Sequence, residues 1–91
     1  MNDTLLLRDQ FNVDDRTFTV LAEPWYDAGG KEWRARYLYL PIDRSLPEIV
    51  YSTPVKHARR RDDLIAMLEK SSDRDLTRAL RAALPAPLRR A

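Results

Sequence analysis

The chain has 91 residues, of which 44% are hydrophobic and 33% are charged, and its formal net charge is +2. This length allows one small hydrophobic core, and the charged share is typical of a folded domain with a well-solvated surface. The chain contains no cysteine, which excludes a disulfide framework, a thiolate nucleophile and a cysteine-based zinc site.

Residues 1–15, MNDTLLLRDQFNVDD, contain one run of three leucines between polar and charged residues. This run is too short for the apolar region of a signal peptide or for a membrane span of about 20 residues. We therefore expect a cytoplasmic protein without membrane attachment. We expect residues 1–15 to form an arm or a short strand at Leu5–Leu7, and the sequence leaves open whether that segment joins a sheet.

The next part of the chain predicts three antiparallel strands. In residues 16–23, RTFTVLAE, one face of a strand would carry Phe18, Val20 and Ala22. Residues 25–32, WYDAGGKE, hold both glycines of the chain and predict a hairpin loop with positive φ angles. Residues 34–40 form the second strand, and residues 48–52, or up to 55, form the third, where Pro54 confines any extension to a sheet edge.

Two helices are predicted after these strands. Residues 60–70 have apolar side chains at helical spacing, with Asp62 and Asp63 near the start, where they favour the helix dipole. Ser72 precedes Asp75 at the spacing of a capping box, and a leucine and alanine stripe follows it at Leu76, Ala79, Leu80, Ala83 and Leu84. Pro85 and Pro87 end this second helix.

This order predicts an α+β fold, an antiparallel three- to four-stranded meander sheet followed by two C-terminal helices packed on one face. Residues 16–84 would form a single domain and residues 85–91 a tail. In the strand at 34–40, the face with Trp33, Ala35, Tyr37 and Tyr39 should meet the helices, because the other face would bury Arg34 and Arg36. Leu38 and Leu40 then lie on the open face, covered by the Leu5–Leu7 segment or by a second subunit.

Positive charge is concentrated in the second half of the chain. Residues 1–48 hold six basic and nine acidic side chains, and residues 49–91 hold ten basic and five acidic ones. The run KHARRR at 56–61 is followed by Arg74, Arg78 and Arg81 at i, i+4 and i+7 of the second helix. Such a distribution is compatible with an anionic partner, and equally with a solvated helix face neutralised by nearby aspartates.

From this distribution we expect a small non-enzymatic domain that contacts nucleic acid through phosphates, without base-specific readout. The expected contact residues are Lys56, Arg59, Arg60, Arg61, Arg74, Arg78 and Arg81. The alternative is a protein-interaction or homodimeric accessory module that uses an open sheet face with Leu38 and Leu40, or a sheet edge. A third interpretation, a stacking platform for unpaired bases, requires that Trp33, Tyr37, Tyr39 and Tyr51 be exposed.

Catalytic patterns are poorly supported in this sequence. His57 is the single histidine, and no second catalytic group stands at a fixed spacing from it. The paired aspartates do not form a calcium-binding loop, and two glycines are too few for a phosphate-binding loop. We therefore expect no catalytic residue, no metal site and no cofactor.

Overall fold

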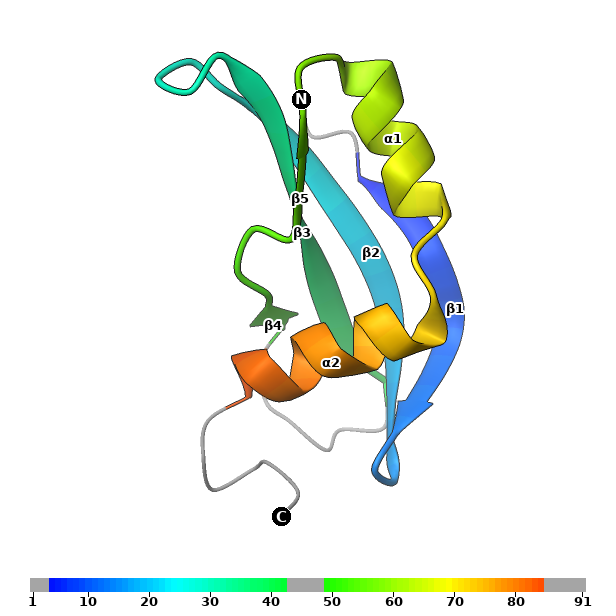
Figure 1. Ribbon diagram of the computed structural model, residues 1–91. Helices are drawn as coiled ribbons and strands as arrows, with labels where there is room; N and C mark the ends of the chain where they lie inside the picture. Colours follow the sequence, from blue (N-terminus) through cyan, green and yellow to red (C-terminus); the bar gives the residue numbers. More distant parts are fainter. Residues whose placement is uncertain (1–3, 43–48, 85–91) are drawn as a thin grey trace.

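The computed structural model describes residues 4–42 and 49–84, in which one antiparallel sheet follows the order of the chain (Figure 1). β1 (Leu5–Val13), β2 (Arg16–Asp27) and β3 (Glu32–Pro41) are successive neighbours. β4 (Val50–Tyr51) and β5 (Lys56–Ala58) both pair with β3, and α1 (Arg61–Glu69) and α2 (Asp73–Ala83) cover one face. The predicted α+β meander with two C-terminal helices is confirmed.

The N-terminal segment joins the sheet as a nine-residue strand, longer than the short strand expected at Leu5–Leu7. A two-residue turn joins β1 to β2, and Asp14 and Asp15 adopt positive φ angles of 50° and 68°. Such angles match a type I′ hairpin turn, which aspartate tolerates. Because β1 pairs beside β2 within the sheet, it does not lie across Leu38 and Leu40 as a covering arm.

The β2–β3 hairpin is longer than predicted, since the strands extend to Asp27 and Glu32 and leave only four residues in the turn. Neither glycine has a positive φ, and Lys31 adopts 52° instead, so the predicted role of the glycines was wrong. Both glycines lie against Asp27: the Gly29 N–H donates to Asp27 Oδ1 at 3.1 Å, and a Cβ atom on Gly30 would lie 2.9 Å from Asp27 Oδ2, so that the Asp27 side chain would have to shift.

The strand expected at 48–52, or up to 55, is present as the two-residue β4, and β5, a further short strand that was not predicted, follows it; Glu48 lies outside the described residues. β4 pairs with the C-terminal half of β3 and β5 with its N-terminal half. Pro54 lies in the break, where it cannot donate a ladder hydrogen bond. Ser52 N–H and Val55 N–H still donate to the Tyr37 and Ala35 carbonyls at 3.0 and 2.9 Å, so the chain stays beside β3 through the break.

The core lies between the sheet and the helices, and it confirms the predicted orientation of β3. Ala35, Tyr37 and Tyr39 are at most 1% exposed, whereas Trp33 is half-buried at the margin of the core. The Tyr39 ring packs edge-on against Phe18, with centroids 5.9 Å apart. The helices contribute the fully buried leucines of the core, namely Leu64, Leu68, Leu76 and Leu80.

Hydrogen bonds fix α2 relative to the sheet. The Tyr39 hydroxyl donates to the Leu76 carbonyl at 2.6 Å, and the Tyr37 hydroxyl shares a 2.7 Å hydrogen bond with Ser71 Oγ. Arg8 of β1 donates to the Ser71 carbonyl at 2.9 Å. The predicted capping box is also present, with Ser72 and Asp75 bonded reciprocally at the start of α2. The α2 surface is therefore held in a fixed place against β3 and β4.

Candidate functional site

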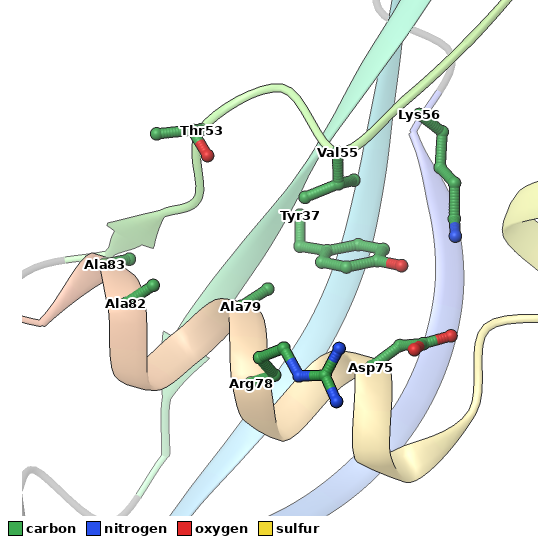
Figure 2. A pocket seen from close by; sticks show the side chains of 9 residues that line it. All are labelled: Tyr37, Thr53, Val55, Lys56, Asp75, Arg78, Ala79, Ala82 and Ala83. Carbon is green, nitrogen blue, oxygen red and sulfur yellow. The ribbon is translucent and has the colours of Figure 1, made fainter.

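The predicted basic residues fall into two groups. Arg59, Arg60 and Arg61 lie at the junction of β5 and α1, at the end of β5 that points away from α2 (Figure 1). Lys56 begins β5 and lines the same hollow as Arg78 from α2, and in Figure 2 the Asp75 carboxylate and the Tyr37 hydroxyl lie between their charged heads. Arg74 and Arg81 flank Arg78 on the same helix. The structure thus brings four of the seven predicted residues together.

Lys56 and Arg78 line a groove of about 300 Å³ between α2 and the break in the edge strand. At one end of this groove the heads of Lys56, Arg78 and Asp75 point toward one another, close to the Tyr37 hydroxyl (Figure 2). The remaining wall is apolar or small. The full lining, here called the basic groove, is Tyr37, Thr53, Val55, Lys56, Asp75, Arg78, Ala79, Ala82 and Ala83.

Local sequence explains why a hollow forms here. The alanines of α2 have side chains too small to fill the space above the sheet. Opposite them, Pro54 interrupts the edge strand, so that Thr53 and Val55 border the hollow instead of a continuous ladder. The groove is therefore built from a break in one element and small residues on the other.

Asp75 is the acidic member of the groove, and its pKa lies below the usual value. The hydrogen bond from the Ser72 backbone N–H, 3.4 Å long, is the largest cause, and the charges of Lys56 and Arg78 lower the pKa further. Asp75 is therefore ionised at neutral pH. It balances one of the two cations, and the polar end of the groove keeps a net positive charge.

A second hollow of about 420 Å³ runs along the outer side of α2, lined by Asp73, Arg74, Thr77, Arg78 and Arg81. Arg81 is held by Asp14 through two hydrogen bonds of 3.0 and 3.2 Å, and Asp73 is paired with Arg8 at 3.0 Å. Within residues 4–42 and 49–84, neither Arg74 nor Arg78 is in an ion pair at salt-bridge distance. All three arginines of α2 are exposed, and Arg74 and Arg78 are the two that no carboxylate of the described residues holds at that distance.

The other group of predicted basic residues, Arg59, Arg60 and Arg61, lies at the start of α1. Arg60 is the N-cap residue, with extended backbone and no side-chain capping bond, and Asp62 and Asp63 occupy the first turn. The Arg61 guanidinium lies 6.0 Å from the centroid of the Trp33 ring. The predicted clustering of positive charge at this helix N-terminus is therefore present, with carboxylates beside it.

Because an arginine stands where a capping side chain is favoured, Arg60→Asp should stabilise the domain. An aspartate at the N-cap accepts a backbone hydrogen bond and favours the helix dipole, which is worth about 1 kcal/mol, or about 4–8 °C in Tm for a domain of this size. Thermal denaturation checks this, with Arg59→Asp, one residue before the cap, as the control with a smaller gain. A lower Tm for Arg60→Asp would show that Arg60 makes a stabilising contact.

The aromatic residues do not form a stacking platform on β3. Tyr37 and Tyr39 are buried against the helices, and Trp33 is half-buried beneath Arg61. On the opposite face, Tyr51 is 45% exposed and the Arg36 guanidinium lies 4.3 Å from its ring centroid. That interpretation fails because its central residues are in the core.

Sequence reasoning missed most of the groove lining. The pattern of α2 predicts Ala79 and Ala83 as part of its core stripe, and the sequence predicts Tyr37 as a core residue or, if exposed, as part of a stacking platform. The one available signal was the density of alanines in the last turns of α2, which predicts a shallow surface wherever they do not meet a large side chain. The partner surface opposite them comes from a distant segment, so spacing alone does not reveal it.

Other kinds of site find little support in the part of the chain that the structure describes. It contains no group of three or more residues able to ligate a metal, and the His57 side chain is 72% exposed, with Nδ1 3.4 Å from Glu32. None of its helices has the length and apolar character needed to cross a membrane. Comparisons with protein families, curated proteins and solved structures yielded no match.

Proposed function

We propose that this chain is a small non-enzymatic binding domain that contacts nucleic acid through phosphates along the side formed by α2 and β5. The observation that carries the proposal is the convergence of Lys56 and Arg78, from two different elements, at one end of the basic groove. Arg74 adds a third cation on the adjoining hollow. Lysine and arginine side chains are the groups that proteins use to neutralise phosphates.

The geometry favours an extended anion over a single small one. Arg78 borders both hollows, so cations follow one another along α2 on either side of it. Residues four apart on a helix, such as Arg74 and Arg78, are about 6 Å apart along its axis, so they can contact different phosphates of one strand. The apolar wall of the groove offers a place for a sugar or a base edge, without any pattern of donors that would specify a base.

The seven predicted residues have different roles in this proposal. Lys56, Arg74 and Arg78 contact phosphates directly. Arg81, paired with Asp14, positions the end of α2, and the junction arginines at 59–61 attract the polyanion over a longer range. The helix-free sheet face contributes little attraction, because its Arg34 and Arg36 are paired with Asp27, Glu32 and Glu23.

Binding to labelled single-stranded and duplex oligonucleotides, measured at several salt concentrations, tests the proposal. Each phosphate contact contributes a slope of about 0.7 for single strands or 0.9 for duplex in log affinity against log salt. We expect Arg78→Ala to reduce the slope by about one such unit and Lys56→Ala with Arg78→Ala by about two.

Lys31→Ala is the matched control, because it removes one positive charge at the exposed β2–β3 turn, away from α2. We expect this variant to bind as the wild type does. The absence of binding by the wild type at low salt, or an equal loss in Lys31→Ala and Arg78→Ala, would refute the proposed interface. Circular dichroism of each variant confirms that the fold is retained.

A further inference from the structure

A row of apolar side chains crosses the sheet on the face that the helices leave open. The pairing registers place Leu6 of β1 opposite Leu21 of β2, Leu21 opposite Leu38 of β3, and Leu38 opposite Tyr51 of β4. Leu6 is 59% exposed and Tyr51 is 45% exposed, while Leu38, between its two neighbours, is 8% exposed. These four residues, here called the cross-strand row, span the full width of the sheet.

The next positions along β2 and β3 carry a matched pair of charges. Glu23 is the register partner of Arg36, and Arg36 Nε lies 2.8 Å from Glu23 Oε1. Farther toward the hairpin, Arg34 is paired with Asp27 at 3.2 Å and Glu32 at 3.1 Å. This part of the face is therefore nearly neutral, and electrostatics do not attract a strongly charged partner to it.

We propose that a second copy of this chain packs face to face on the cross-strand row. The two-fold axis lies between the two sheets and parallel to the strands, midway between β2 and β3. This rotation reverses the order of the strands, so that the partner's β3 lies over β2 and the partner's β4 over β1.

That axis makes the face complementary to itself. It places Leu21 opposite the partner's Leu38, and Leu6 opposite the partner's Tyr51. Two residues farther along each strand, on the same face, the axis places Glu23 opposite the partner's Arg36, and Arg36 opposite the partner's Glu23. Aligned sheets cross at about −30°, and this charged position lies only about 7 Å from the cross-strand row, so the match holds near the axis.

A two-fold axis that runs across the strands, along the cross-strand row, gives no such match. It would place β2 over the partner's β2, with Glu23 over the partner's Thr19, and the charges would not be opposed. Charge complementarity thus selects one of the two arrangements. It also favours a second copy of this chain as the partner. A single rotation brings both the charged pair and the leucines of one face opposite complementary groups on an identical face.

Charge exchange at this pair is the decisive test. Glu23→Arg and Arg36→Glu each break the pair within a chain and place like charges opposite each other in their own dimers, so we expect each dimer to weaken at least about tenfold. An equal mixture of the two variants places opposite charges across the interface in both contacts. We expect sedimentation equilibrium to show a heterodimer in that mixture.

The double variant, Glu23→Arg with Arg36→Glu, keeps the pair within the chain and the contacts between chains. We expect it to dimerise like the wild type, which keeps the test decisive if a single variant folds poorly. The apolar part is tested by Leu6→Lys, which should weaken the dimer, and by Met67→Lys on α1, which should not. Met67 is 39% exposed and lies in the helical layer.

Three outcomes would overturn the proposal: a wild-type protein that stays monomeric over about a thousandfold range of concentration, a mixture of single variants that fails to associate, or a dimer unaffected by Leu6→Lys. Because this face lies on the opposite side of the sheet from α2, Lys56→Ala with Arg78→Ala should leave the dimer intact. A failure of this inference therefore does not bear on the nucleic-acid interface.

Discussion

Leu80→Ala should lower the free energy of unfolding by about 2–5 kcal/mol, because a fully buried leucine loses its transfer energy and leaves a cavity. A chain of 91 residues has a total stability of about 5–14 kcal/mol, so this change removes a large share of it. Since 1 kcal/mol corresponds to about 4–8 °C for a domain of this size, Tm should fall by at least about 10 °C. Urea denaturation and a melting curve measure both quantities.

Met67→Ala is the matched comparison for this large effect. Met67 is on the neighbouring helix with 39% of its surface exposed, so its truncation removes little buried area and should cost less than about 1 kcal/mol. If Leu80→Ala proved as mild as Met67→Ala, α2 would not be packed on the sheet as described. The basic groove would then lose its wall, because Ala79, Ala82 and Ala83 belong to the same helix.

The elements with strong periodicity were the ones that the sequence predicted well. Strand β2 alternates between apolar and polar residues, and α2 repeats its leucines at helical spacing after a Ser72 cap. Both signals are local, and in each element the side chains that the repeat places on the apolar face are the buried ones. The orientation of β3 followed from a simple energetic comparison, because burial of two arginines costs more than burial of two tyrosines.

The features that were missed depend on contacts between distant parts of the chain. The segment at 5–13 lacks clean alternation because register irregularities interrupt its pairing with β2. The Asp14–Asp15 turn has no glycine to mark it. The split of the edge strand around Pro54 depends on how β3 pairs with two separate pieces, which no local pattern encodes.

The same distinction applies to the candidate site. Charge counting identified Lys56 and Arg78, but their convergence depends on the packing of α2 against the edge strand. It also gave Arg81 the same role as Arg78, although Asp14, 67 residues away in sequence, pairs with Arg81 and leaves Arg78 exposed to solvent. Composition therefore predicts the sign of a surface, and only the fold decides which charges remain available to a partner.

The two buried tyrosines predict a loss of stability at alkaline pH. Burial raises the pKa of Tyr37, an effect that its hydrogen bond to Ser71 partly opposes, and burial raises the pKa of Tyr39 more strongly. A tyrosine whose pKa is raised in the folded state contributes full stability below pH 10.0, the ordinary value. Above that pH the unfolded chain releases protons that the folded protein keeps, so stability falls as pH rises toward the folded pKa.

Each such tyrosine should cost about 1.4 kcal/mol per pH unit above its ordinary pKa. Tyr39→Phe removes this dependence at one site, and at neutral pH it loses only the hydrogen bond to Leu76, about 1 kcal/mol. The variant should therefore be less stable than the wild type near pH 8 and at least as stable near pH 11.5, by urea denaturation across this range. Tyr26→Phe, at a ring that is 50% exposed, controls for other titrating groups and should follow the wild type. Parallel curves for wild type and Tyr39→Phe would mean that the Tyr39 hydroxyl is not held in the core, and the contact that positions α2 would have to be reassigned.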